Sequence, residues 1–198
     1  YKRQVQLNTI QDAKAAGIGM VFQEFSLIPS LTVAQNIYLT VEPKGRFGLI
    51  SDRESRRRAA KVFADMDVVV DCAAPVGSLS TAYWQLTEIA KALAQDARVL
   101  IMDEPTASLA RHEVAALFKL IGRLKARGIS IIYISHRMDE VYRIADRITI
   151  LRDGKRLMTE PLSSVTPEQI VEGIVGRQVH GALEYRERDA STGGEVLL

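Results

Sequence analysis

Two adjacent carboxylates, Asp103 and Glu104, follow the apolar run Val-Leu-Ile-Met at residues 99–102, and Pro105 comes directly after them. Because proline cannot donate to a β ladder, this pattern predicts a buried strand that stops at the acids. Ligands of open α/β sheets bind at the carboxyl ends of the strands. Asp103 therefore suits a phosphate-bound Mg²⁺ ion, and Glu104 suits polarisation of an attacking water. The alternative is an ordinary buried strand followed by a solvated acidic turn.

Two further predicted strands end in polar groups that fit the same chemistry. Residues 18–22 predict a short buried strand that leads into Gln23, and residues 129–135 predict an apolar strand that leads into His136. Gln23 offers an amide oxygen to Mg²⁺, and His136 offers a donor to a terminal phosphate. The carboxyl ends of parallel strands converge on one crevice, so we expect these groups to meet the two acids. A lone histidine after a strand is usually structural, but its place in this order favours the functional interpretation.

The segments between these strands predict an α/β fold with a parallel sheet. Apolar residues in segment 111–126 recur with helical spacing, and Gly128 ends that helix before the next strand. Strand, helix and strand in this order form a right-handed βαβ unit. The other predicted elements are helices at 10–16, 34–39, 53–66 and 167–175, a helix after Ser80, and a hairpin of strands 147–151 and 155–158.

Ser80 precedes a predicted helix in which Leu86, Ile89, Ala90 and Leu93 keep helical spacing. The amino end of a helix presents free backbone amides and binds anions readily. This segment alone favours the simpler interpretation that Ser80 only caps the helix, with an anion-binding role as the alternative.

The composition limits the class of protein. Of the 198 residues, 47% are hydrophobic and 25% are charged, with a net charge of +2, as in an ordinary globular protein. Arg56, Arg57 and Arg58 are interpreted as the charged face of a helix, so no nucleic-acid partner is expected. Cys72 lacks the companions of a disulfide or zinc site. No apolar run is long enough to span a bilayer, and residues 1–12 do not resemble a signal peptide.

With these motifs identified, nearly the whole chain resembles the ATP-binding subunits of ABC transporters. The matching segments are a Q-loop at 21–24, a signature region at 79–83, a Walker B strand at 100–104, a D-loop at 108–110 and an H-loop at 134–136. The sequences of residues 88–93 and 135–141 are similar to those of the subgroup that serves importers of ribose, galactose and xylose. Proteins of that subgroup fuse two nucleotide-binding domains in one polypeptide.

The resemblance implies a P-loop NTPase-like α/β fold of the ABC ATPase type, with a parallel sheet, a helical subdomain near residues 30–95 and a missing amino-terminal part. Residues 1–178 would form the nucleotide-binding domain. Residues 179–198 would be a linker and the start of a second domain. No G-x-x-x-x-G-K-[S/T] motif occurs in the chain. Since that phosphate loop precedes the Q-loop in the family, we expect the chain to begin after it.

The resemblance also implies roles for the site residues, with ATP and Mg²⁺ as cofactors. Gln23 would bind Mg²⁺ and sense the γ-phosphate, and Asp103 would bind Mg²⁺. Glu104 would act on water, and His136 would hold the γ-phosphate. Ser80 would serve a site across the interface with a second domain. The implied activity is ATP hydrolysis coupled to sugar import, with little or none in this chain alone.

The implied partners are the transporter's membrane subunits, a second nucleotide-binding domain and, indirectly, a periplasmic sugar-binding protein. The implied location is cytoplasmic, at the inner face of the cell membrane. The chain departs from the family pattern at Ala82 in place of glycine, Tyr83 in place of glutamine and Ala110 in place of aspartate. The strand of the phosphate loop would be central in the sheet. Uncovered apolar edges therefore predict low stability or self-association.

Two other classes of protein are considered. DNA-repair ATPases share the Q-loop, signature and Walker B, but they place coiled coils or zinc modules between Q-loop and signature. The short spacing from Gln23 to Leu79, without heptads or cysteine clusters, disfavours that class. A non-catalytic interaction module would keep only the transporter-facing surface, and would not bind ATP even with a complementary domain.

Overall fold

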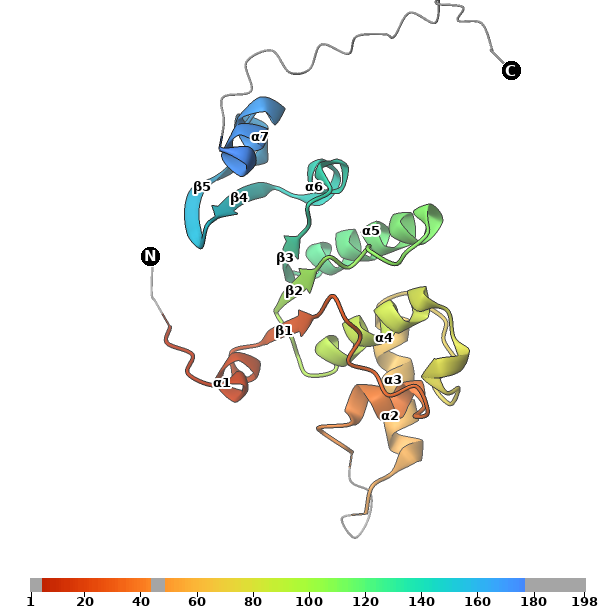
Figure 1. Ribbon diagram of the computed structural model, residues 1–198. Helices are drawn as coiled ribbons and strands as arrows, with labels where there is room; N and C mark the ends of the chain where they lie inside the picture. Colours follow the sequence, from red (N-terminus) through yellow and green to blue (C-terminus); the bar gives the residue numbers. More distant parts are fainter. Residues whose placement is uncertain (1–4, 44–48, 177–198) are drawn as a thin grey trace, which may run out of the picture. The chain divides into compact units, whose positions relative to one another are not determined.

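The computed structural model describes residues 5–43 and 49–176, and its contacts form two units, Tyr1–Ile144 and Ala145–Leu198 (Figure 1). The first unit holds a three-stranded sheet and the second a two-stranded sheet. The predicted domain boundary at 178/179 lies outside the described residues and stays a prediction.

The three-stranded sheet is parallel, with β2 (Val99–Asp103) between β1 (Ile18–Val21) and β3 (Ser130–Ile134). Val21 at the end of β1 is in register with Met102, and Asp103 at the end of β2 is in register with Ile134. All three strands therefore finish at one edge of the sheet, as the sequence predicts.

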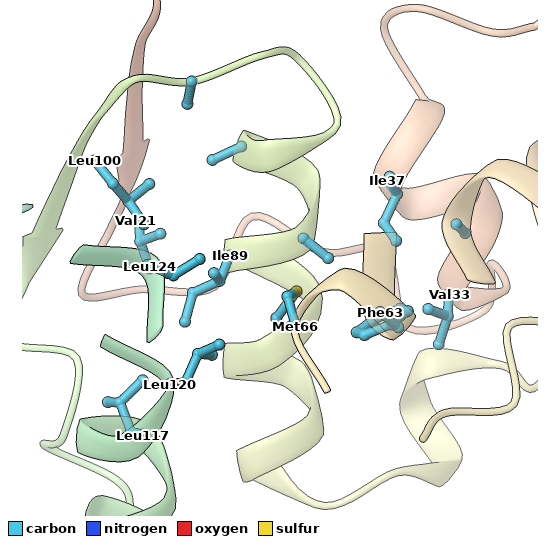
Figure 2. Packing of buried hydrophobic residues seen from close by; sticks show 14 of the residues in the cluster. Val21, Val33, Ile37, Phe63, Met66, Ile89, Leu100, Leu117, Leu120 and Leu124 are labelled. Atoms are coloured by element: carbon cyan, nitrogen blue, oxygen red, sulfur yellow. The ribbon is translucent and has the colours of Figure 1, made fainter. Parts of the chain in front are cut away.

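Helix α5 (Arg111–Ala126) connects β2 to β3 with the bounds that the sequence predicts. Its buried residues are Leu117, Phe118, Leu120, Ile121 and Leu124. Figure 2 shows Leu124 beside Val21, Leu100 and Ile89, within one buried cluster. Helix α6 (Met138–Ile144) follows β3 and is not among the predicted elements. Its seven residues complete fewer than two turns, too few to set up a clear apolar period.

Three further helices of the first unit pack on one another: α2 (Val33–Tyr38), α3 (Asp52–Asp65) and α4 (Thr81–Leu93). Thr32 and Gln35 form a capping box at the start of α2, and the Ser51 hydroxyl accepts from an amide of α3. Val33, Ile37 and Phe63 meet between these helices (Figure 2). The three helices fall within residues 30–95, the range expected for a helical subdomain, and begin within about one residue of the predicted positions.

Helix α4 approaches β1 closely because Gly19 has no side chain. A Cβ atom at Gly19 would lie 2.9 Å from the Cβ of Ala92 and 3.0 Å from the Cβ of Ala97. Small residues on both sides therefore set the distance between the helix and the sheet.

The remaining elements follow their local sequence signals. Helix α1 (Ile10–Ala15) begins at the Thr9 capping box and ends before Gly17, which has a φ of +77°. In the second unit, β4 (Arg147–Arg152) and β5 (Lys155–Pro161) form the predicted antiparallel hairpin, and α7 (Pro167–Val175) follows. Short 3₁₀ turns at Val76–Ser78 and Leu162–Ser164 complete the described secondary structure.

Strand β3 lies at an edge of its sheet and is less covered than its apolar sequence indicates. Ile132 is 50% exposed and Ile134 is 45% exposed. Leu100 and Met102 in the central strand are fully buried, as predicted. Among the described residues, no helix is both long and apolar enough to cross a membrane.

Candidate functional site

Glu104 and His136, from the ends of β2 and β3, meet at the carboxyl edge of the sheet. The Glu104 Oε1 atom lies 2.7 Å from the His136 Nδ1 atom and accepts a 3.1 Å hydrogen bond from the His136 amide. The Glu104 side chain is 16% exposed, whereas the His136 side chain is 80% exposed. The Glu104 carboxylate thus holds both the backbone and the ring of His136. The rest of the ring is open to a ligand.

The backbone of Glu104 adopts a left-handed conformation, with a φ of +46°. This conformation is strained for a residue with a side chain, at a cost of about 1–2 kcal/mol. Two hydrogen bonds hold the turn: the Glu104 amide donates to the Ile134 carbonyl at 3.0 Å, and the Ala107 amide donates to the Glu104 carbonyl at 3.1 Å. Strain held by the surrounding structure is frequent at functional sites.

Asp103 and Gln23 leave the sheet at the same edge. Asp103 is the last residue of β2 and is partly exposed, and Gln23 comes two residues after the end of β1 and is exposed. Mg²⁺ is usually bound by one or two protein oxygens together with phosphate oxygens and water. A carboxylate and an amide oxygen at one strand edge fit that chemistry.

Ser80 occupies the N-cap position of α4, but its side chain makes no capping hydrogen bond. Ser80, Thr81 and Tyr83 are exposed, whereas Ala82 and Trp84 are partly buried. Ala92, near the other end of α4, packs on β1, and twelve residues of helix separate it from Ser80 by about 18 Å. Within the described part of the chain, no hydrogen bond or ion pair joins Ser80 to Gln23, Asp103, Glu104 or His136.

Glu88, a buried acid that the sequence does not single out, anchors the chain beyond Gln23. Its side chain, 3% exposed, accepts from the Ser26 amide at 2.6 Å and from the Ser26 hydroxyl at 2.8 Å. The Lys91 ammonium also donates to the Ser26 hydroxyl, at 3.0 Å. The only sequence signal for this contact is an acid within the apolar stripe of α4.

Glu140, a second buried acid, lies beneath the turn that carries His136. It accepts from the hydroxyls of Thr106 and Tyr133 and pairs with Arg137. Burial raises the pKa of the Tyr133 hydroxyl, and its hydrogen bond to Glu140 raises it further. The sequence predicts His136 but not this support.

The sequence and the fold were compared with known proteins. A family model described as ABC transporter matches residues 2–107, just over half of the chain. A putative ribose/galactose/methyl galactoside import ATP-binding protein of Burkholderia lata is 47% identical over 197 residues, which cover 99% of this chain and 38% of that protein. A ribose import ATP-binding protein of Hahella chejuensis is 43% identical over 193 residues, which cover 98% of this chain and 38% of that protein. The chain therefore spans less than two fifths of the length of these relatives.

Solved structures with the same fold include cbiO1 from Clostridium perfringens, part of an ABC transporter complex. It matches with a TM-score of 0.65 and 26% identity, over 82% of this chain and 63% of that chain. A dimeric ATP-binding cassette in a post-hydrolysis state, bound to ADP and Pi, matches with a TM-score of 0.62 and 28% identity, over 79% and 68%. The fold and the site together define an α/β P-loop NTPase-like cassette of the ABC ATPase type. The chain belongs to the ABC transporter family.

Proposed function

We propose that this chain is the ATP-binding and ATP-hydrolysing component of an ABC importer for a monosaccharide. The 2.7 Å contact between Glu104 and His136, beside Asp103, is the observation that carries the proposal. The names of the relatives, which are sugar import ATP-binding proteins, support the cargo class.

The chemistry of the site divides among four side chains. Asp103 and Gln23 would hold Mg²⁺, which would supply charge neutralisation for the phosphates. Glu104 orients the attacking water. Glu104 orients the His136 ring through Nδ1, which leaves Nε2 for contact with the γ-phosphate.

Ser80 completes a site on a second nucleotide-binding domain. Its unused hydroxyl and the free amides at the start of α4 suit a γ-phosphate that another domain presents. Ala82 carries a Cβ where the family has glycine, which limits how closely this backbone approaches a phosphate. Ala110, the N-cap of α5, has no side-chain oxygen with which to contact the neighbouring site.

The chain alone binds ATP weakly. A phosphate loop contributes backbone amides and a lysine that surround the β- and γ-phosphates, and its sequence motif is absent from the 198 residues. Glu104 and His136 are placed for the terminal phosphate and do not replace that loop.

The remaining partners are membrane subunits and, through them, a periplasmic sugar-binding protein. Phe22 and Ile28, on either side of Gln23, are apolar and are 50% and 41% exposed. Such side chains suit contact with a membrane subunit. The chain would then lie in the cytoplasm, at the inner face of the cell membrane.

The proposal is tested by calorimetric titration of MgATP into the full chain, alone and mixed with a phosphate-loop-bearing domain from one of the relatives. We expect binding only in the mixture. Ser80→Ala should weaken that binding, whereas Ser78→Ala should not, because the Ser78 hydroxyl is already bonded to the Pro75 carbonyl at 2.8 Å.

The outcomes separate the alternatives. Micromolar binding by the chain alone would mean that another surface replaces the phosphate loop, contrary to the proposal. No binding in either titration would favour a non-catalytic interaction module.

A further inference from the structure

The Glu140 carboxylate is buried almost completely and is held by donors from several segments. The residue is 1% exposed. Thr106 Oγ1 lies 2.9 Å from each of its two oxygens, and the Tyr133 hydroxyl donates to Oε2 at 2.6 Å. The Arg137 Nη1 atom lies 2.8 Å from Oε1. A buried carboxylate is costly unless it is paired and hydrogen-bonded, and these donors meet that need.

The donors to Glu140 come from the two loops that carry the reactive pair. Thr106 lies two residues after Glu104, on the turn that leaves β2. Arg137 directly follows His136, and Ser135 directly precedes it. The Ser135 hydroxyl accepts from the Arg137 amide at 3.0 Å, which closes a small turn around His136. A shift of α6 therefore moves both loops together.

Resting on the proposed function, we propose that Glu140 is a positioning residue that holds Glu104 and His136 in contact by fixing the turns on which they lie. Glu140 does not itself touch the reacting atoms. Its hydrogen bond to Thr106 holds the turn that carries Glu104, and its ion pair with Arg137 holds the turn that carries His136. Removing either link loosens one partner of the 2.7 Å contact.

A purely structural role for Glu140 would affect the unit as a whole, and the chain contains a matched control. Glu88 is also a glutamate, is 3% exposed and lies in the same unit, but its partner is Ser26. Glu140→Gln and Glu88→Gln therefore make the same chemical change at equal burial. Only the first change affects the turns beside Glu104 and His136.

The readout is the tautomer of the His136 ring in the full chain without nucleotide. Nitrogen-15 NMR measures the ratio of the Nδ1–H to the Nε2–H form at alkaline pH, and a His136→Asn variant identifies the signal among the three histidines. We expect Nδ1–H to predominate in the wild type, because Nδ1 faces the Glu104 carboxylate. In Glu140→Gln the ratio should fall about fivefold, the effect of one ordinary hydrogen bond.

Thr106→Val serves as a second variant, because it removes one hydroxyl, keeps the side-chain shape and leaves Glu140 its other donors. It should lower the same ratio, and Glu88→Gln should leave it unchanged. An unchanged ratio in Glu140→Gln, or in Thr106→Val if the glutamine variant does not fold, would overturn the proposal. An equal fall in Glu88→Gln would overturn it too, since general loosening would then explain the effect.

This test needs no nucleotide, so its failure differs from failure of the proposed function. A lowered ratio together with absent ATP binding in the mixed titration would keep the positioning role and reject the ATPase role. An unchanged ratio together with ATP binding in the mixed titration would reject the positioning role and keep the ATPase role.

Discussion

At the scale of single residues, the glutamates of this chain differ by their neighbours. Glu104 orients a histidine, and Glu140 is buried among hydroxyls and an arginine. Glu54 forms hydrogen bonds with Arg57 and Arg58 on the surface of α3. Three glutamates thus differ in role: Glu104 lies in the candidate site, Glu140 is buried and bonds to neighbouring loops, and Glu54 forms ion pairs on the surface.

One prediction at this scale concerns Glu104. Glu104→Gln keeps the size of the side chain but removes the charge that faces His136 Nδ1, so the ratio of the Nδ1–H to the Nε2–H form of that ring should fall about fivefold in the full chain at alkaline pH. Glu113→Gln, at a side chain that accepts from the Ala110 amide, is the control and should leave the ratio unchanged. An unchanged ratio in Glu104→Gln would contradict the contact between Glu104 and His136 on which the proposed function rests.

A second prediction concerns pH. Hydrogen bonds from Arg57 and Arg58 lower the pKa of Glu54 from 4.5 to about 2. Because the folded-state pKa is depressed, the stabilisation is present above pH 4.5 and is lost as pH falls towards 2. Glu54→Gln should therefore lower the melting temperature by a few degrees at most at pH 7, with the difference vanishing near pH 2. Melting curves across this range check it, and a difference that grows on acidification would contradict it.

At the scale of elements, close packing of α4 on β1 positions the first strand of the site. Gly19 lies where the two elements touch, whereas Gly122 in α5 has open space around it. The same substitution should therefore act in opposite directions at these two glycines.

Gly19→Ala should lower the free energy of unfolding by about 1–3 kcal/mol, because its Cβ would meet Ala92 and Ala97 at 3.0 Å or less. Gly122→Ala should raise it by about 1 kcal/mol, because alanine is the better helix former. Denaturant unfolding of both variants measures the two changes. A stabilising Gly19→Ala would contradict the close approach.

At the scale of the whole molecule, the exposed edge of β3 makes self-association an expected property. Edge strands with apolar side chains pair readily with other chains. Ile132→Lys should therefore shift the chain towards monomer in sedimentation velocity. Val69→Lys, at a side chain that is 91% exposed outside the sheet, should not. A monomeric wild type would contradict this prediction.

Much of the fold follows from local signals in the sequence. The bounds of α5 come from its apolar period and from Gly128, and the β4–β5 hairpin comes from Asp153 and Gly154, whose φ angles of +51° and +71° suit a tight turn. The parallel sheet follows from the alternation of strands and helices. Helix α6 escapes prediction because it is short and directly follows a strand.

The sequence by itself determined the strand ends that carry Gln23, Asp103 and His136, because apolar runs, proline and helical periods act over a few residues. Only the tertiary structure decided which acids are buried and what they hold. Glu104 meets a residue 32 positions away, Glu140 bonds to one 34 positions away, and Glu88 bonds to one 62 positions away. Such pairings depend on how the strands are placed side by side, and no local pattern of residues encodes them.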